Sequence, residues 1–260
     1  MPFTFAHPAA ILPLRRFKLL KTVPLIVGSI APDLPYYVPA RVNRMVMLDT
    51  HTFWGTFRLD LPMGLLVLLC GFLLRRPLTA LMSGRARSLC LQAMEHFKDQ
   101  PRHWLLAPIA LLIGSWTHLL WDSFTHDNGW LVKRVAALSA PITIGDYTGT
   151  LCHVLQYVSS VAGLLILAIW YRRLATPAVE PPGAVATSSF ARTALLLLVI
   201  LTAVAIGAYT ATHAALTGAS NYRVIYLMLT RSIAWFAALY LAAGLFVTFT
   251  QKKPEALAET

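Results

Sequence analysis

Six stretches of the chain are almost free of charged residues and long enough to form helices. They lie near residues 22–38, 60–74, 104–122, 151–171, 193–216 and 224–250. Each of the last four can cross about 30 Å of hydrocarbon as an α-helix, whereas the first two are shorter. The pattern therefore predicts an all-α fold, a polytopic transmembrane helical bundle of about five or six helices.

The N-terminal stretch has two interpretations. If 22–38 is a full span and the N-terminus stays inside, His7 is too far from the other candidates to share their site. If 9–20 and 23–32 are instead two short helices joined by a basic turn, they form a re-entrant hairpin, because helices of about 10–12 residues reach only about 15–18 Å. The hairpin would return Asp33 to the end at which His7 lies.

Composition divides the chain into four regions. Pro, Ala and Ser are frequent between Thr176 and Ser189, which is typical of a linker. We therefore expect a membrane region with the candidate metal site over 1–173 and a cytoplasmic linker over 174–192. A C-terminal pair of transmembrane helices over 193–250 and a polar tail over 251–260 complete the division.

The amino-acid composition and charge support membrane insertion. Hydrophobic residues make up 57% of the chain and charged residues only 13%, and the net charge is +11. Most Lys and Arg residues fall in alternate connections, on the side of the N-terminus. The positive-inside rule then places both termini at the cytoplasm and 39–59, 123–150 and 217–223 outside. The lipid bilayer is the expected partner, and the charge requires no nucleic acid.

Three side chains of metal-ligand type lie at the end of one apolar stretch. Residues 118–126 read HLLWDSFTH, and on a helix this spacing aligns His118, Asp122 and His126 on one face. Imidazole and carboxylate groups there are unfavourable against lipid unless they are paired, hydrated or bound to metal. A metal site is one interpretation. The other is that His118 and Asp122 form a hydrogen-bonded pair that helps to join helices and binds no metal.

Further candidate ligands lie nearer the N-terminus, namely His7, Asp33 and His51. With the hairpin, they would share the outer membrane face with the first three. A set of His and Asp suits a divalent metal ion, Zn²⁺ first and Mn²⁺ or Fe²⁺ as alternatives. Such an ion with an open coordination position lowers the pKa of bound water and polarises a phosphoryl or carbonyl oxygen. Metal-assisted hydrolysis is the chemistry that these residues favour.

Several short blocks resemble a family of bacterial integral membrane proteins classed as a domain of unknown function. They read PFTFAHPA at 2–9, GSIAPD at 28–33, HTFWG at 51–55, DLP at 60–62 and HLLWDSFTH at 118–126. The blocks occur in order over roughly the first two-thirds of the chain. The resemblance implies a protein of the bacterial cytoplasmic (inner) membrane and no particular activity.

A more distant resemblance is to membrane-bound metal-dependent hydrolases, which share an N-terminal His, a Pro-Asp, a loop His and His-x3-Asp in this order. By position, it implies as metal ligands His7, Asp33, His51, His118 and Asp122, with a looser counterpart for His126. Pro35 stands where a second acid often follows the Pro-Asp. That departure weighs against the binding of two metal ions.

Other classes of membrane hydrolase fit less well. The chain has no His-Glu-x2-His string of a zincin-type protease. Phosphatidic-acid-type phosphatases have a Ser-Gly-His block, whereas here Ser83-Gly84 is followed by Arg85. The three cysteines, Cys70, Cys90 and Cys152, have no CxxC spacing, which is typical of small buried residues.

Arg231 lies inside the last apolar stretch and is a candidate for binding substrate phosphate, because guanidinium recognises phosphate bidentately. The alternative is an Arg that extends to the lipid headgroups. The residues together predict a membrane-embedded metal-dependent hydrolase acting on a lipid-linked or membrane-accessible (phospho)ester. A non-enzymatic transporter or metal-binding membrane protein is the alternative function.

Overall fold

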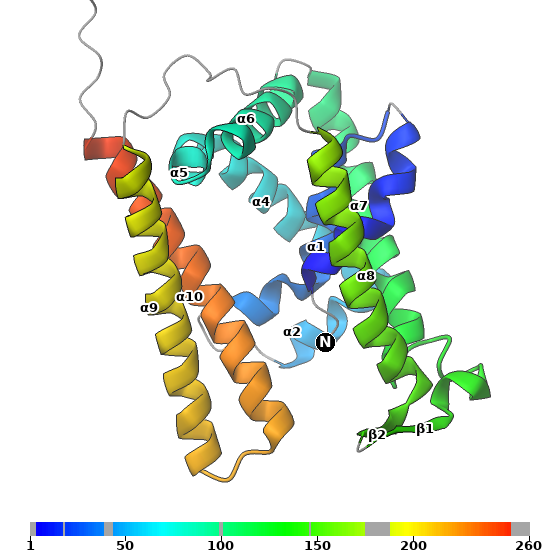
Figure 1. Cartoon of the computed structure of the whole chain (residues 1–260). Helices are drawn as coiled ribbons and strands as arrows, with labels where there is room; N and C mark the ends of the chain where they lie inside the picture. Colours follow the sequence, from blue (N-terminus) through cyan, green and yellow to red (C-terminus); the bar gives the residue numbers. More distant parts are fainter. Residues whose placement is uncertain are drawn as a thin grey trace, which may run out of the picture. The chain divides into compact units, whose positions relative to one another are not determined.

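The computed structural model describes residues 4–17, 19–38, 44–98, 101–145, 147–174 and 188–250. The elements of the N-terminal half are η1 (Thr4–Arg16), α1 (Thr22–Ile30), η2 (Ala31–Tyr37), α2 (Arg44–Asp49), α3 (Phe53–Gly55), η3 (Thr56–Asp60), α4 (Leu61–Leu73), α5 (Arg75–Ala80), α6 (Gly84–Lys98) and α7 (Pro101–Thr125). Those that follow are η4 (Ala136–Ser139), β1 (Pro141–Ile144), β2 (Tyr147–Thr150), α8 (Leu151–Leu174), α9 (Ser189–Leu216) and α10 (Asn221–Thr250). Strands β1 and β2 form an antiparallel hairpin just before α8 (Figure 1).

Five helical segments of the described chain are long and apolar enough to cross a membrane. They are Phe53–Leu73, Pro101–Thr125, Leu151–Leu174, Ser189–Leu216 and Asn221–Thr250. The predicted all-α polytopic bundle is therefore confirmed, and the chain is an integral membrane protein. The span expected at 60–74 begins earlier, because α3, η3 and α4 follow one another without a break.

The N-terminal stretch does not form a sixth span. Helix α1 ends at Ile30, and the chain continues as the short 3-10 helix η2. Pro32 and Pro35 lie in η2, and neither can donate the backbone hydrogen bond that an α-helix requires. The stretch 22–38 is not among the five candidate spans, and η1 packs against α1, which favours the hairpin over the full span. The hairpin of two short helices, here η1 and α1, is confirmed.

The chain divides into two compact units, and each is described by itself. Unit 1 contains 1–35, 42–69 and 95–175, and unit 2 contains 36–41, 70–94 and 176–260. Residues 70–94 thus group with the C-terminal helix pair and not with the region 1–173 of the predicted division. Of the expected linker at 174–192, residues 175–187 lie outside the described residues, and α9 already begins at Ser189. The predicted tail, 251–260, lies outside the described residues.

Unit 1 is centred on close packing of α1 against α7. A Cβ atom at Gly28 would lie 2.1 Å from the carbonyl oxygen of Leu111, and one at Gly114 would lie 2.4 Å from that of Leu25. The two backbones are therefore in direct contact, an approach that small residues permit between membrane helices. Buried apolar side chains flank this contact, namely Leu68, Ala107 and Leu111 in one cluster and Ile11, Leu25 and Ala110 in another.

Helix α8 packs against η1 and α7 in unit 1. A Cβ atom at Gly163 would lie 3.0 Å from the Cβ of Ala6, and the indole N–H of Trp121 donates to the Ser159 hydroxyl at 3.1 Å. These contacts place the start of η1 beside the C-terminal part of α7. His7, next to Ala6, is thereby brought to the end of α7 that carries the predicted ligands.

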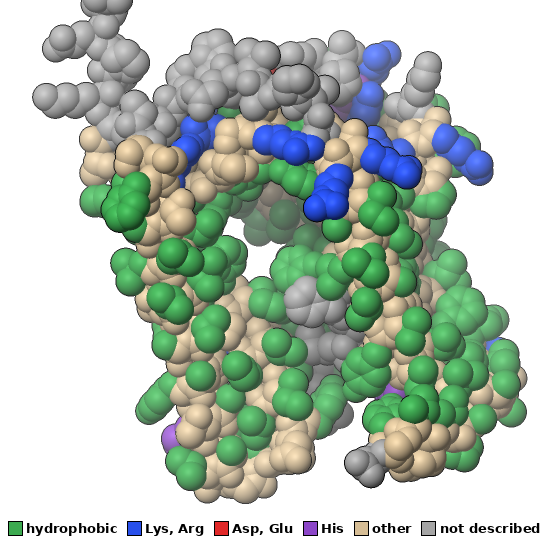
Figure 2. Space-filling view, viewed as in Figure 1, with side chains coloured by type: hydrophobic (Ala, Val, Ile, Leu, Met, Phe, Trp, Pro, Cys, Tyr) green, Lys and Arg blue, Asp and Glu red, His purple; other side chains and the backbone are tan. Residues whose placement is uncertain are grey.

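Basic residues gather at one end of unit 1. Arg15 and Arg16 end η1, and Arg172 and Arg173 lie in the last turn of α8. Figure 2 shows Lys and Arg side chains around the end at which α8 terminates, with hydrophobic side chains along the helix below them. Helix α7 begins at the basic end, so its C-terminal turns lie at the other. This is the charge distribution that the positive-inside rule predicts for one helical unit.

Unit 2 is built on the antiparallel helices α9 and α10 (Figure 1). Gly207 of α9 packs against Ser232 and Met228 of α10, where a Cβ atom would lie 2.0 Å from the Ser232 hydroxyl. Helix α5 packs on α10 through Gly244, and the Tyr240 hydroxyl donates to the Leu78 carbonyl at 3.0 Å.

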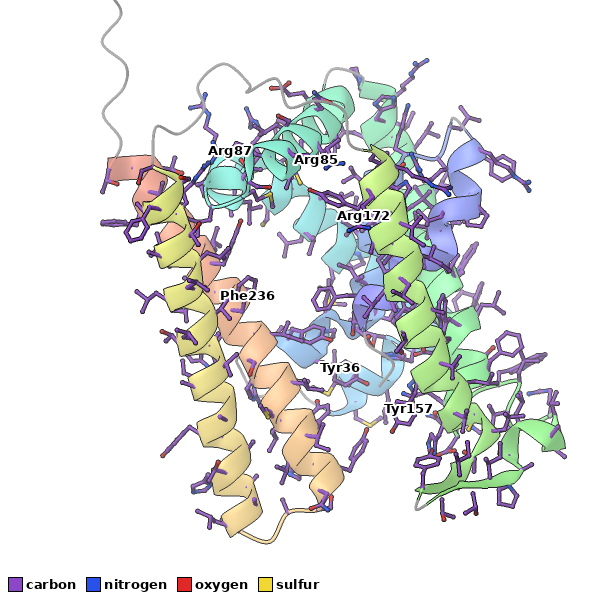
Figure 3. The ribbon with its side chains drawn as sticks, in the orientation of Figure 1. Tyr36, Arg85, Arg87, Tyr157, Arg172 and Phe236 are labelled. Atoms are coloured by element: carbon purple, nitrogen blue, oxygen red, sulfur yellow. The ribbon has the colours of Figure 1, made fainter. Side chains whose placement is uncertain are left out.

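A buried arginine caps the end of α5. Arg85 and Arg87 both come from the start of α6 (Figure 3). Arg87 is buried and donates from Nε to the Thr79 carbonyl at 3.0 Å and from Nη2 to the Ala80 carbonyl at 2.7 Å. The last carbonyls of a helix lack partners within the helix, so this guanidinium takes the place of the missing donors. Arg87 therefore has a structural role, whereas Arg85 is exposed.

Candidate metal centre

The first three candidate ligands lie together at the C-terminal end of α7, as the spacing predicts. His118 Nε2 lies 3.3 Å from Asp122 Oδ2, and His126 Nδ1 lies 3.5 Å from Asp122 Oδ1. His118 and Asp122 are one turn apart on α7, and His126 follows the helix end by one residue. Asp122 therefore lies between the two imidazoles.

The N-terminal candidates converge on the same carboxylate. His7 Nε2, on η1, lies 3.6 Å from Asp122 Oδ1. His51 Nε2, in the turn between α2 and α3, lies 3.7 Å from Asp122 Oδ2 and 3.2 Å from Asp33 Oδ1. His118 Nε2 lies 3.7 Å from Asp33 Oδ1. The structure thus brings together all six predicted residues, which we call the six-residue cluster: His7, Asp33, His51, His118, Asp122 and His126.

Backbone carbonyls orient two of the imidazoles. His118 Nδ1 lies 2.8 Å from the Ser29 carbonyl, and His51 Nδ1 lies 3.0 Å from that of Met47. A carbonyl only accepts, so in both rings Nδ1 carries a proton, and in the neutral form of each ring Nε2 has its lone pair towards the cluster. Metal-binding histidines are commonly held by this kind of bond. The close packing of α1 on α7 supplies the first of these carbonyls.

Asp33 is held in a similar way. Its Oδ2 accepts a hydrogen bond from the Thr4 hydroxyl, and its Oδ1 faces His51 and His118. Thr4 and Asp33 are both buried. One oxygen of the carboxylate is therefore used to fix its orientation, and the other is available to the cluster.

Several buried polar atoms of the cluster lack hydrogen-bond partners among the described residues. They are His7 Nδ1, His7 Nε2, His118 Nε2 and Asp122 Oδ1. The His7 ring stacks on that of His118 with centroids 3.7 Å apart, so each blocks one face of the other from water. An unpaired buried acceptor is costly. A cation among these atoms would remove that cost.

The spacing of the donor atoms fits a bound metal ion. Two ligands bound at about 2.1 Å and a tetrahedral angle are about 3.4 Å apart. The nearest contacts between imidazole nitrogens and carboxylate oxygens in the cluster span 3.2 to 3.7 Å. In two overlapping triads, one donor atom from each residue lies within 4.8 Å of the other two, namely His7, Asp33 and His118, and His51, His118 and Asp122. The donor set and its spacing therefore fit a divalent transition metal.

The electrostatics of the cluster favour the metal-binding forms of His7 and Asp33. Burial lowers the pKa of His7 to about 3, and the neighbouring His118 adds to this effect, so the ring is neutral at pH 7. Burial alone would raise the pKa of Asp33, but the imidazoles of His118, His51 and His7 outweigh it and hold that pKa below its usual range. Asp33 is therefore an ionised carboxylate, and His7 has a free lone pair.

Asp60 is a functional candidate that the sequence analysis did not assign. Its side chain is fully buried in unit 1, and neither carboxylate oxygen has a hydrogen-bond partner among the described residues. It ends the π-helical turn η3, in which the Leu61 N–H donates to the Thr56 carbonyl five residues back. Wide turns of this kind often lie at functional sites. The signal in the sequence was a single acid inside an apolar span, within the DLP block.

The turn η3 is attached to the helix that carries the cluster. Trp116 of α7 donates from its indole N–H to the Thr56 hydroxyl at 3.2 Å. Trp116 lies two residues before His118, and Asp60 lies four residues after Thr56. This contact holds Asp60 on the span that packs beside the cluster-bearing part of α7.

Arg231 lies on α10, in unit 2, whereas the six-residue cluster belongs to unit 1. Its Nη1 donates to the Val38 carbonyl at 3.3 Å, also within unit 2. The hydrogen bond is compatible with an arginine that still has free donors, since guanidinium has five. Its predicted role in binding phosphate stays a prediction.

Comparison with known proteins gives a family but no activity. No curated protein and no solved structure matches the chain. One family model matches residues 1–249, which include every element that forms the cluster. The chain belongs to the family described as a domain of unknown function, DUF4184.

Proposed function

We propose that the protein is a membrane-embedded metal-dependent hydrolase that acts on a lipid-linked or membrane-accessible ester, most simply a phosphoester. The observation that carries the proposal is the convergence of four imidazoles and two carboxylates, several with buried and unpaired donor atoms. The order of these residues along the chain, which is similar to that of membrane-bound metal-dependent hydrolases, adds support. Zn²⁺ is the first choice of ion, with Mn²⁺ or Fe²⁺ as alternatives.

The residues of the cluster divide into ligands and supports. His51 and His118 offer Nε2, while Asp33 and Asp122 offer carboxylate oxygens. When bound, a divalent ion supplies Lewis acidity towards the ester oxygen and lowers the pKa of a water molecule at its open position. Ser29 and Met47 keep the two imidazoles in the tautomer that presents a lone pair.

Asp60 is the proposed proton acceptor. A general base needs a carboxylate that protein hydrogen bonds do not already saturate, and Asp60 has both oxygens available among the described residues. The ligand carboxylates differ, because Asp33 accepts from Thr4 and faces His51. A separate acceptor leaves Asp33 and Asp122 to hold the metal ion.

Exposed aromatic residues next to the cluster favour a lipid substrate. Phe53, Trp54 and Phe57 follow His51, and Phe53 stacks on Trp116 with ring centroids 5.7 Å apart. Phe53 is 54% and Trp54 68% exposed. Aromatic side chains of this kind are typical of the level of the lipid headgroups. Placed there, the cluster would meet an ester at the membrane surface.

A non-enzymatic transporter or metal-binding protein is the second candidate. The observation that favours it is again Asp60, because a buried carboxylate within a span is also typical of ion pathways. In that case the six-residue cluster would bind the ion during its passage. Metal flux into proteoliposomes without ester hydrolysis would support this function over the first.

The cytoplasmic membrane of bacteria is the proposed location. The basic end of unit 1 would face the cytoplasm, and the six-residue cluster, at the opposite end of α7, would face outwards. The substrate would then be a lipid of the outer leaflet or an ester delivered to it.

The test of the hydrolase is an assay of the purified full chain in nanodiscs with Zn²⁺ or Mn²⁺. The substrates are a lipid phosphomonoester, a lipid diphosphate and a lipid carboxyl ester, and the measured products are phosphate and fatty acid. Hydrolysis of one of them should fall at least about 100-fold in His118→Ala. His213→Ala, an exposed histidine of α9, is the matched control and should keep full activity. Equal rates in wild type and His118→Ala would contradict the proposal.

Replacing Arg231 by Met is expected to raise the KM for a phosphoester about tenfold or more and to leave the metal content unchanged, since guanidinium binds phosphate but not cations. Steady-state kinetics on the substrate found in the assay would measure this effect. Arg223→Met, an exposed arginine in the first turn of the same helix, is the control. An unchanged KM in Arg231→Met would contradict the role in phosphate binding. The hydrogen bond to the Val38 carbonyl would then be the role that remains for Arg231.

A further inference from the structure

A second group of metal-ligand side chains lies in unit 1, where α7 ends and α8 begins. Asp127 follows α7, and Cys152 and His153 lie in the first turn of α8. The Cys152 thiol donates to Asp127 Oδ1 at 3.3 Å, and His153 Nε2 lies 3.1 Å from Asp127 Oδ2. One donor atom from each of the three lies within 4.8 Å of the others. None of these residues belongs to the six-residue cluster.

The backbone holds Asp127 in place from one side. The Gly129 N–H donates to the His126 carbonyl at 2.7 Å, and a Cβ atom at Gly129 would lie 2.5 Å from the Ser123 carbonyl oxygen. The turn after α7 therefore folds back tightly on the helix, and only glycine fits at this point. Asp127 lies inside this turn.

The β-hairpin places the other two residues. Thr150 ends β2, where it pairs with Pro141 of β1, and α8 begins at the next residue. The Thr150 hydroxyl lies 3.0 Å from Cys152 Sγ and 3.5 Å from Asp127 Oδ1. The three donor atoms are thus brought together by two separate backbone elements. Little rearrangement is needed for them to bind one ion.

The three side chains differ in how deeply they are buried. Cys152 is fully buried, whereas the side chain of His153 is 36% and that of Asp127 64% exposed. The thiol would therefore bind from the protein side, and the face opposite to it is open to water. Three protein ligands and one open position are typical of a zinc site that exchanges its fourth ligand.

We propose that Asp127, Cys152 and His153 form a second site for a divalent transition-metal ion, with Zn²⁺ as the best match. Thiolate, imidazole and carboxylate are the three ligand types that Zn²⁺ accepts in proteins. On binding, the thiol releases its proton to water, and a metal–sulfur bond replaces the S–H···O hydrogen bond to Asp127. The site stands independently of the hydrolase function, because it shares no residue with the six-residue cluster.

The alternative is that the three residues form a hydrogen-bonded start of α8 and bind no ion. The two cases differ in one property, which is ligation by sulfur. Co²⁺ bound by a thiolate has an intense near-ultraviolet charge-transfer band, and Co²⁺ bound by imidazole and carboxylate alone does not. The six-residue cluster contains no cysteine, so this band reports the second site only.

The experiment is a Co²⁺ titration of the purified full chain in detergent, followed by absorption. Wild type should develop the charge-transfer band at about one equivalent per thiolate site, and Zn²⁺ should abolish it. Cys152→Ser should lack the band, whereas Cys70→Ser and Cys90→Ser, the matched controls, should keep it. The double variant His118→Ala/Asp122→Ala should also keep it, which separates this site from the six-residue cluster. A wild type without the band, or a band that persists in Cys152→Ser, would overturn the proposal.

Asp127, which is exposed, and His153, which is half-buried, provide a test that does not require substitution of the buried thiol. Asp127→Asn and His153→Gln are expected to weaken Co²⁺ binding about tenfold or more each while the band keeps its position at saturation. Unchanged Co²⁺ affinity in both variants would equally overturn the site.

Discussion

Replacing His118 and Asp122 together by alanine is expected to remove a near-stoichiometric metal ion from the purified protein. His118 and Asp122 belong, with His51, to a triad that has one donor atom of each residue within 4.8 Å of the others, and both side chains are buried. Loss of two ligands from a site of this kind lowers metal affinity by far more than the 10- to 100-fold that a single supporting contact contributes. Mass spectrometry of the detergent-purified protein, without added metal and after exposure to Zn²⁺ or Mn²⁺, measures the effect.

The control for this measurement is His213→Ala, in unit 2, which should bind as much metal as wild type. The proposed site at Cys152 would hold one ion of its own. The comparison of wild type with the double variant is therefore repeated with Cys152→Ser present in both proteins. Equal and negligible metal in wild type and in the double variant would favour the alternative in which His118 and Asp122 are a hydrogen-bonded pair. The main support for a metal-dependent enzyme would then be lost.

Asp60→Asn is expected to lower the rate of hydrolysis at least about 100-fold with little change in metal content. General bases typically contribute 10²- to 10⁴-fold to the rate. An amide has nearly the shape of the carboxylate but accepts no proton at neutral pH. The stability should be equal or higher, because a buried carboxylate without a partner costs more than a neutral amide. Activity, metal content and the midpoint of thermal unfolding are the three measurements.

Asp49→Asn is the matched control for Asp60. Asp49 precedes the same span and forms an ion pair with Arg58 at 2.7 Å, with the Arg58 side chain 64% exposed. Surface pairs contribute little, so both activity and stability should stay close to wild type. A loss of metal in Asp60→Asn would instead make Asp60 a ligand. Full activity with metal retained would exclude it as the proton acceptor.

The sequence predicted the transmembrane fold because the physical signals are local. A span is recognised from about 20 successive apolar residues, since every backbone polar group within it must be satisfied by its own helix. The alignment of His118, Asp122 and His126 is also local, because it follows from the helical repeat. The remaining candidate ligands, His7, Asp33 and His51, followed from their order in a resemblance and from one of two possible foldings of the N-terminus.

The N-terminal folding depends on contacts between distant residues. Pro32 and Pro35 were visible in the sequence, but the hairpin requires the backbone contact of Gly28 with Leu111, a residue far along the chain. The grouping of 70–94 with the C-terminal helices also depends on contacts between segments that are far apart in the sequence. Composition and periodicity describe one segment at a time and do not contain such pairings.

By itself, the sequence determined that the chain is an all-α membrane protein and which side chains were candidate ligands. Only the tertiary structure decided that the six candidate ligands converge, that Asp60 is buried without a hydrogen-bond partner among the described residues and that Cys152 lies beside Asp127 and His153. The physical reason is that hydropathy and helical spacing are properties of neighbouring residues. A metal-ligand geometry is instead a set of distances, and it exists only after the helices have packed.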